Sequence, residues 1–167
     1  RLDNETKQFD KLIEAYSKSN LIEDKIPLVI IGEGKDRKCL EEKIKRLNME
    51  GLIRLEGFKK DVYSYMKFAD FLVMSSYVEG FPNTLLEALV VGTPVVSFDC
   101  PSGPSELIID GENGILVENQ NFNALINAMD KMHIDLEFYN QCKAGAVSSV
   151  EKFSSKNVIS KWVQLFN

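Results

Sequence analysis

The chain has 167 residues, about the length of one domain, and its 20 lysines and arginines stand against 25 aspartates and glutamates, a net charge of −5. This balance argues against a nucleic-acid-binding domain, which normally shows a basic surface. The composition, 44% hydrophobic and 27% charged, is that of a globular protein rather than a disordered one. No apolar run reaches the roughly 18 residues of a membrane-spanning helix.

The cysteines and the single histidine are too few and too far apart in the sequence to suggest a disulfide framework or a metal site. The three cysteines lie at positions 39, 100 and 142. This spacing predicts neither a disulfide framework nor a Cys/His metal centre, and it favours a reduced, cytoplasmic setting. The sequence begins with Arg1, and no signal-like segment follows it. We therefore expect the chain to be a piece of a longer protein.

Apolar periodicity predicts an alternation of helices and short buried strands. Phe9, Leu12, Ile13 and Tyr16 recur at helical spacing and predict a helix over residues 6–19. The predicted strands are residues 28–31, 53–58, 71–74, 93–98 and 114–117. The later predicted helices include one through Leu40, Ile44 and Leu47, one from Asp61 to Ala69, and residues 83–91, 105–109, 121–132, 135–150 and 154–166.

This order of elements predicts an α/β fold. Parallel neighbouring strands need crossover connections, so the sheet should be doubly wound, mostly parallel and Rossmann-like, with helices on both faces. We expect one domain over residues 1–167, in which the helices of about 121–167 form a cap or cross over onto another domain. Ligands bind beyond the carboxyl ends of the strands in such sheets. Ligand-binding residues are therefore expected in the loops 32–36, 57–61, 75–83 and 99–105.

The turn Gly32-Glu-Gly34 has the beginning of a dinucleotide-binding fingerprint. The third glycine of that motif would fall at position 37, which is Arg37. A plain tight turn between a strand and a helix is the favoured interpretation. A nicotinamide-dependent oxidoreductase would need the missing glycine and an acidic residue at the end of the second strand. There is also no P-loop sequence, which excludes a P-loop NTPase.

The segment from Glu79 to Glu87 is more informative. Gly80 permits a ligand to approach the backbone closely, and the first turn of the helix that starts near Asn83 and Thr84 suits a phosphate. Glu87 lies one turn further on, where its carboxylate could accept two hydroxyl protons, as from a ribose. On spacing alone, a well-capped helix with two solvated glutamates explains the segment equally well.

The two glutamates, eight positions apart and enclosing Gly-Phe-Pro, resemble the Glu-x7-Glu signature of the retaining GT-B glycosyltransferases of group one. The similarity continues over nearly the whole chain. Segments that resemble the family are Ile31-Gly-Glu-Gly34, Leu55-Glu-Gly-Phe58, Ala88–Val96, Cys100–Glu106 and Asp110–Val117. The resemblance implies the C-terminal, nucleotide-sugar-binding half of a two-domain enzyme, here without its first strand and its N-terminal acceptor domain.

The resemblance also implies roles for catalytic residues. Arg1 and Lys7 would neutralise the diphosphate and stabilise it as the leaving group, and Glu79 would contact the donor sugar. The basic pair of the family is usually five positions apart, whereas Arg1 and Lys7 are six apart. A one-residue insertion would account for the difference, although a solvated lysine at a helix start is the alternative for Lys7.

Donor-binding roles follow in the same way. Glu87 would hold the ribose hydroxyls, and the base would lie against the loop of Phe58 and Lys59. The remaining donor-binding positions implied by the resemblance are the backbone groups of Gly80 and Phe81 at the sugar and the helix start of Asn83, Thr84 and Leu85 at the phosphates.

The implied reaction is transfer of a hexose or N-acetylhexosamine from a UDP-sugar to a saccharide acceptor, with retention of configuration. Bacterial polysaccharide, O-antigen or lipid-linked glycan assembly at the cytoplasmic face of the membrane is the expected setting. No Asp-x-Asp motif occurs, so no metal or other cofactor is expected besides the UDP-sugar substrate. We expect the isolated chain to be inactive. A sugar-nucleotide epimerase of the same architecture and a non-catalytic nucleotide-binding module are the alternatives.

Overall fold

The computed structural model describes residues 1–165, apart from the side chains of Lys161 and Leu165. The strands are β1 (Leu28–Ile31), β2 (Ile53–Gly57), β3 (Leu72–Met74), β4 (Val95–Phe98) and β5 (Gly114–Val117). The α-helices are α1 (Asn4–Lys7), α2 (Phe9–Tyr16), α3 (Arg37–Arg46), α4 (Val62–Phe68), α5 (Asn83–Val90), α6 (Pro104–Leu107), α7 (Phe122–Ile134), α8 (Leu136–Ser149) and α9 (Ser155–Leu165). Two short 3-10 helices are η1 (Asn20–Ile22) and η2 (Glu151–Phe153).

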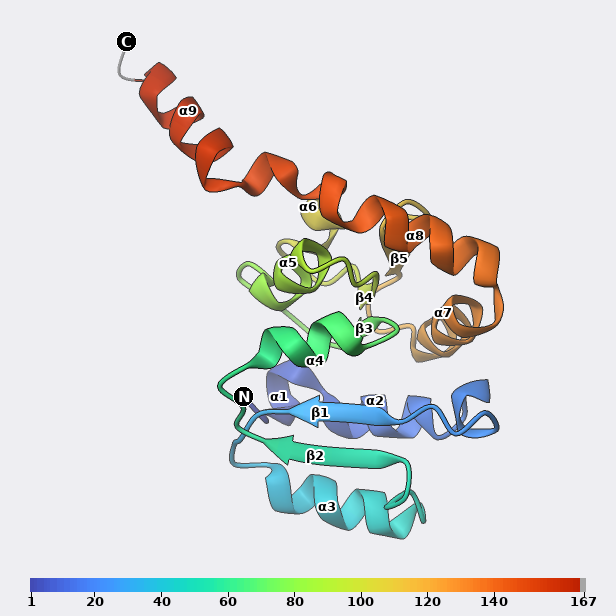
Figure 1. The fold of residues 1–167 in the computed structure, drawn as a ribbon. Helices are drawn as coiled ribbons and strands as arrows, with labels where there is room; N and C mark the ends of the chain where they lie inside the picture. The colour runs from blue at the N-terminus through green and yellow to red at the C-terminus, as the bar shows by residue number, and fades with distance from the viewer. Residues whose placement is uncertain (166–167) are drawn as a thin grey trace.

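All paired strands are parallel, which confirms the predicted α/β fold class. The described strands form two sheets, with the orders β1-β2 and β3-β4-β5, rather than one continuous sheet. Figure 1 shows α3 on the outer side of the first sheet and α5 with α8 beside the second. The N-terminal segment contacts the chain just after both β1 and β3, because Leu2 N–H donates to the Glu33 carbonyl and Tyr77 N–H donates to the Thr6 carbonyl. Parallel α/β proteins bind ligands at these carboxyl strand ends.

The N-terminal helix differs from the prediction because it is broken. Asp3 caps the first turn by accepting the backbone N–H of Glu5 at 3.2 Å, and α1 ends at Lys7. Gln8 then adopts a left-handed conformation with φ of 52°, after which α2 starts at Phe9. The periodicity of apolar residues over 9–16 is real, but a left-handed residue interrupts the hydrogen-bond ladder that the single predicted helix required.

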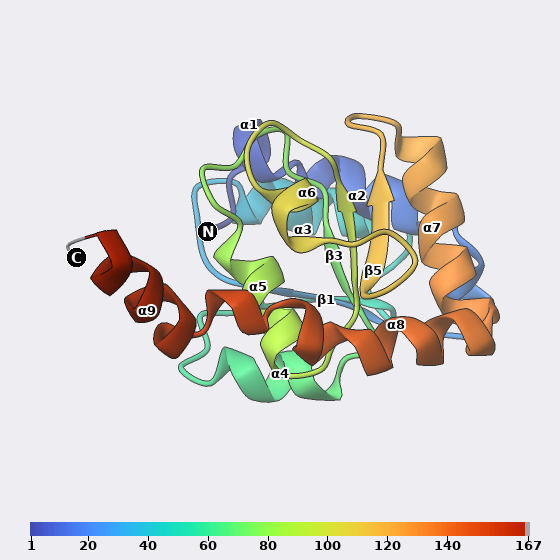
Figure 2. The same ribbon diagram turned by 90° about the horizontal axis from the view of Figure 1, so that it is seen from above.

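The C-terminal helices match the predicted segments to within a few residues. The prediction over 154–166 ends at Phe166, which lies outside the described residues. Helix α9 runs away from the two sheets in both views (Figures 1 and 2). Apolar side chains that include Val158 and Ile159 are exposed on it. No helix among the described residues combines the length and the apolar character needed to cross a membrane.

The hydrophobic core fixes the elements that carry the loop between β3 and α5. All four residues of β4 are fully buried, because β4 lies between β3 and β5 in its sheet. Helix α5 packs Leu85 and Leu89 into this core, and both are 0% exposed. The ring of Phe98 meets that of Phe122 edge to face, with 4.9 Å between the centroids. The start of α5 is therefore held in place relative to the end of β3.

Candidate functional site

An ion pair joins the N-terminal segment to the loop after β3. The Lys7 Nζ lies 2.5 Å from Glu79 Oε1, and the Ser76 hydroxyl donates to the same oxygen at 2.6 Å. The Glu79 side chain is 10% exposed and that of Lys7 is 32% exposed, so the pair is largely screened from water. The structure thus brings together two predicted catalytic residues that are 72 positions apart.

Backbone contacts hold this pair in place. The Ser75 hydroxyl donates to the Lys7 carbonyl at 2.8 Å. One residue earlier along the same segment, the Thr6 carbonyl accepts the N–H of Tyr77 at 2.8 Å. The carboxyl end of β3 therefore anchors the backbone of α1, and the position of the Lys7 ammonium follows from that anchoring.

The ion pair lies beside a cavity of about 960 Å³. The cavity is bounded by β1 and β3 and by the loop after β2. Six of the predicted site residues line it: Arg1, Lys7, Phe58, Lys59, Thr84 and Glu87. Its size lies at the upper end of the roughly 300–1,000 Å³ that ligand pockets normally have.

Arg1 and Lys59 carry positive charge at the rim of this cavity. The Arg1 guanidinium is 3.4 Å from Asp3 Oδ2, and the Arg1 side chain is 76% exposed. Lys59 Nζ pairs with Glu56 Oε2 at 2.9 Å, and that hydrogen bond raises the pKa of Lys59. Phe58 is an exposed ring in the same loop. Contact of a base with this loop stays a prediction, for which the exposed Phe58 ring offers a stacking surface.

The other predicted donor-binding residues do not line this cavity. Phe81 packs its ring edge to face on Phe153, at 5.9 Å between centroids. The N–H of Asn83 donates to the Phe81 carbonyl and that of Leu85 to the Pro82 carbonyl, both at 2.9 Å. The N–H groups of Asn83 and Leu85 are therefore engaged within the turn, and Thr84 is the helix-start residue that faces the cavity.

The loop that carries Glu79 rests on the turn after β4. Glu79 N–H donates to the Pro101 carbonyl at 3.3 Å. Gly103 has φ of 105°, and a Cβ there would overlap the ring of Pro82. Gly80, by contrast, has nothing within 4 Å of an added Cβ, which leaves open space for a ligand to approach its backbone. The Cys100–Gly103 turn therefore packs against the loop that carries Glu79.

The structure gives a reason for the glycines of the Gly32-Glu-Gly34 turn. A Cβ on Gly34 would lie 2.7 Å from the backbone nitrogen of Leu2. Leu2 itself donates its N–H to the Glu33 carbonyl at 2.9 Å. The chain's own N-terminal segment therefore packs directly against this turn. The prediction of a plain tight turn fits this geometry.

Two polar residues that line the cavity, Ser75 and Ser76, and a nearby pair, Gln8 and Gln120, were not among the predicted ones. Ser75 and Ser76 directly follow β3, and their place at a carboxyl strand end is a signal that could have identified them. Gln8 and Gln120 exchange side-chain hydrogen bonds at 3.0 Å although they are 112 positions apart. The loop after β5 that contains Gln120 belongs to the same edge of the fold, and its position is apparent only once the strand order is known.

Two of the three cysteines, Cys100 and Cys142, are buried. Burial raises the pKa of the Cys100 thiol, and the Glu79 carboxylate raises it further, while burial raises the pKa of Cys142 to about 11. Only thiolates react readily, so both thiols should stay unmodified at pH 8. We expect iodoacetamide to alkylate the exposed Cys39 alone, as measured by mass spectrometry of the folded protein. Modification of Cys100 at a similar rate would show that the loop opens.

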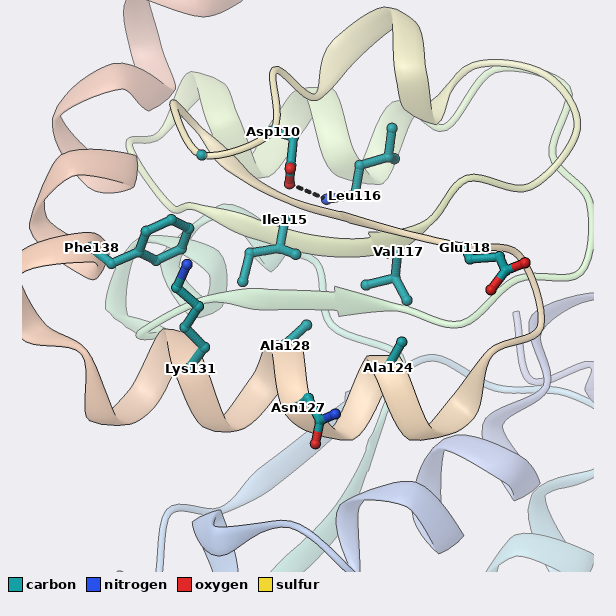
Figure 3. A pocket seen from close by; sticks show the side chains of 11 residues that line it. Asp110, Ile115, Leu116, Val117, Glu118, Ala124, Asn127, Ala128, Lys131 and Phe138 are labelled. Atoms are coloured by element: carbon teal, nitrogen blue, oxygen red, sulfur yellow. Dashed lines mark hydrogen bonds between the residues drawn. The ribbon is translucent and has the colours of Figure 1, made fainter.

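A second cavity of about 450 Å³ lies between β5 and the helices α7 and α8 (Figure 3). No predicted site residue lines it. Asp110 Oδ1 accepts the N–H of Leu116 at 3.0 Å, and the Lys131 ammonium lies 3.7 Å from the centroid of the Phe138 ring. Within residues 1–165, His, Cys, Asp and Glu side chains form no group of three or more that could hold a metal ion. Independence from metals stays a prediction.

The family model described as Glycosyl transferases group 1 matches residues 1–148. This match covers far more than half of the chain. The chain therefore belongs to the group 1 glycosyltransferase family.

The chain matches only part of the length of two longer relatives. It is 35% identical over 147 residues to the N-acetylgalactosamine-N,N'-diacetylbacillosaminyl-diphospho-undecaprenol 4-alpha-N-acetylgalactosaminyltransferase of Campylobacter jejuni, covering 88% of this chain and 40% of that enzyme. A structure of a TarM variant from S. aureus with Fondaparinux, alpha-GlcNAc-glycerol and UDP matches at a TM-score of 0.89 and 29% identity, covering 97% of this chain and 33% of that one.

A further solved structure shows which half of a group 1 glycosyltransferase has this fold. The C-terminal domain of a group 1 family protein (LpcC) from Francisella tularensis matches at a TM-score of 0.78 and 27% identity, covering 87% of this chain and 78% of that one. The fold is therefore that of the C-terminal half of GT-B glycosyltransferases. The chain spans less than half the length of the Campylobacter and S. aureus proteins.

Proposed function

We propose that this chain binds the nucleotide part of a UDP-sugar and serves as the donor-binding half of a retaining glycosyltransferase. The observation that carries the proposal is the Lys7–Glu79–Ser76 cluster at the carboxyl end of β3, beside a cavity that Thr84 and Glu87 also line. A cation held at this edge of a parallel sheet and beside a helix start is suited to a diphosphate.

The electrostatics of the cluster support this role. Glu79 and Ser76 hold the Lys7 side chain in one position before any ligand arrives, so little rotamer entropy remains to be lost on binding. Lys7 would then offset the charge that develops on the diphosphate as the glycosidic bond breaks. Arg1, which is more exposed and lies on the same cavity, would add a second positive charge.

The relatives favour a particular donor and acceptor class. The TarM complex contains UDP, and the Campylobacter enzyme is named for transfer of N-acetylgalactosamine to a diphospho-undecaprenol-linked saccharide. We infer a UDP-hexose or UDP-N-acetylhexosamine donor and a saccharide or lipid-linked saccharide acceptor in bacterial glycan assembly at the cytoplasmic membrane face. The acceptor would be bound by an N-terminal half, so the 167-residue chain alone should not catalyse transfer.

Replacing Glu87 by Ala tests the donor site. Loss of a charged hydrogen-bond partner costs about 1.5–3 kcal/mol, so the affinity for UDP should fall by about tenfold to a hundredfold. Isothermal titration calorimetry gives the affinity, and NMR shifts should cluster at residues 79–87. Glu137→Ala is the matched control, since Glu137 is an exposed helical glutamate remote from the cavity. An unchanged UDP affinity in Glu87→Ala would contradict the assignment.

The same titration with GDP and NADH separates the nucleotide classes. Response to UDP alone supports a UDP-sugar, whereas saturable binding of NADH with shifts at residues 32–37 would favour an oxidoreductase. Product analysis on the full-length protein then distinguishes the enzymes. Transfer needs an acceptor, an epimerase gives a rearranged sugar without one, and a non-catalytic module gives neither product.

A further inference from the structure

The segment that follows α8 contacts the loop of residues 79–82. Phe153, the last residue of η2, packs its ring edge to face on the ring of Phe81, with 5.9 Å between the centroids. The neighbouring Lys152 ammonium donates to the Glu106 carbonyl in α6 at 3.1 Å. Two consecutive residues of η2 therefore contact the connections that follow β3 and β4.

These two connections also contact each other. Glu79 N–H donates to the Pro101 carbonyl at 3.3 Å, and an added Cβ on Gly103 would overlap the Pro82 ring. The loop is thus held at its first and last residues, and Phe81 lies between these contacts. Phe81 is 40% exposed, so the core does not enclose its ring, and the contact with η2 limits where that ring can lie.

The end of α8 gives η2 a fixed position. Gly145 lies so close to the loop before β5 that an added Cβ would overlap the Glu112 carbonyl. The Asn113 side chain donates to the Ser149 hydroxyl at 2.7 Å, and Asn113 is 0% exposed. Because η2 begins two residues after α8 ends, the Phe153 ring is attached to a helix end that the core holds in place.

The Phe81 ring belongs to a stretch of backbone beside an open space. An added Cβ on Gly80 would meet nothing within 4 Å. The family resemblance implies that the backbone groups of Gly80 and Phe81 contact the donor sugar, whereas Lys7 and Glu87 line the cavity proposed for the nucleotide. A contact that fixes Phe81 should therefore act on the sugar end of the donor and not on its UDP part.

We propose that Phe153 is a positioning residue for the donor sugar: its ring holds Phe81, and with it the backbone of residues 80 and 81, in the orientation that binds the sugar. The inference rests on the proposed function, because it assumes that a UDP-sugar occupies the site. A loop that is ordered before its ligand arrives loses less conformational freedom on binding, and this difference appears as affinity. Without the Phe153 ring, that cost would arise when the sugar binds and not when UDP alone binds.

Calorimetric titration of Phe153→Ala with UDP and with UDP-sugars tests this role. The sugar nucleotides are UDP-glucose, UDP-galactose, UDP-N-acetylglucosamine and UDP-N-acetylgalactosamine, and the one that the parent chain binds most tightly is compared with UDP. Phe153→Ala should weaken binding of that UDP-sugar by about threefold to tenfold, whereas the affinity for UDP should change by less than about twofold. NMR shifts that the UDP-sugar causes beyond those caused by UDP should lie at Gly80 and Phe81 in the parent chain.

Two variants serve as controls. Phe153→Tyr keeps an aromatic ring and should bind both ligands as the parent chain does. Phe138→Ala is the matched control, because Phe138 is a partly buried ring that lines the second cavity, and it should leave both affinities unchanged.

The outcomes separate this inference from the proposed function. A parent chain that does not bind UDP would contradict the proposed function, and this inference with it. Where the parent chain binds UDP, three results would overturn the role of Phe153 alone. They are equal losses for UDP and the UDP-sugar, an unchanged UDP-sugar affinity in Phe153→Ala, and a parent chain that binds none of the four UDP-sugars.

Discussion

Replacing Lys7 by Met is expected to weaken UDP binding by about tenfold to a hundredfold. The substitution removes a charge-assisted interaction worth about 1.5–3 kcal/mol. It also leaves the Glu79 carboxylate, which is 10% exposed, without its cation beside the bound diphosphate. Calorimetric titration with UDP measures the loss, and circular dichroism should show an unchanged fold.

Replacing Glu79, the ion-pair partner of Lys7, should have the opposite effect on the affinity for UDP. Glu79→Gln removes a negative charge next to the diphosphate while the Gln oxygen still accepts from Ser76, so UDP should bind about threefold to tenfold more tightly. In the double variant Lys7→Met/Glu79→Gln, the loss should be smaller than the two single effects predict when added, because no unpaired carboxylate remains. Lys18→Met is the control, since it removes only an exposed surface pair with Glu14.

Additive effects of the two substitutions would show that Lys7 and Glu79 do not act on the ligand as a pair. In the full-length protein, Glu79→Gln should nonetheless reduce transfer, because the proposed role of Glu79 is at the donor sugar. Tighter UDP binding together with slower transfer is a combination that a purely structural ion pair does not produce.

The second large effect is expected for Gly34→Ala. A Cβ at this position would overlap the backbone of Leu2, which cannot move without disturbing its hydrogen bond to Glu33. Overpacking of this kind costs about 1–3 kcal/mol in the free energy of unfolding, measured by urea denaturation. The displaced segment carries Arg1 and Lys7, so UDP affinity should fall as well.

Gly80→Ala is the matched comparison for Gly34→Ala. An added Cβ at Gly80 meets nothing within 4 Å, so the free energy of unfolding should stay within about 0.5 kcal/mol of the parent. A reduced affinity for a UDP-sugar in Gly80→Ala, with unchanged stability, would therefore report a direct ligand contact. A Gly34→Ala protein as stable as the parent would mean that the N-terminal segment does not pack on this turn in solution.

The fold could be predicted from the sequence because its signals are local. Short apolar runs such as Leu28–Ile31 alternate with amphipathic stretches, and parallel pairing follows from the crossover helices between them. At their helix starts Asp61 and Asn121 accept backbone N–H groups at 3.0 Å, and Asp and Asn are both residue types that favour this position. The periodicity of the apolar residues does not indicate that Gln8 is left-handed, because that conformation depends on tertiary contacts.

The site was predicted less completely than the fold. The Glu79–Glu87 segment and Lys7 stand out by pattern and resemblance, and the structure brings Lys7 to Glu79. Ser76 and Gln120 have no motif of their own, and their roles depend on which loops meet in space. The hydrogen bond from the Leu85 N–H to the Pro82 carbonyl likewise depends on the geometry of the turn, which the residue types at the start of a helix do not specify.

The reciprocal amide contact between Gln8 and Gln120 has a consequence for the order in which the protein is made. The segment that carries Lys7 leaves the ribosome first, but its partners lie 72 and 112 positions later. Because the Gln8–Gln120 contact holds the residue next to Lys7, we expect the proposed nucleotide site to form during vectorial synthesis only after the loop after β5 has emerged and docked. Nascent chains arrested before residue 120 should therefore fail to retain UDP even though β1 and α2 are already complete, and acquisition of binding would mark the completion of folding.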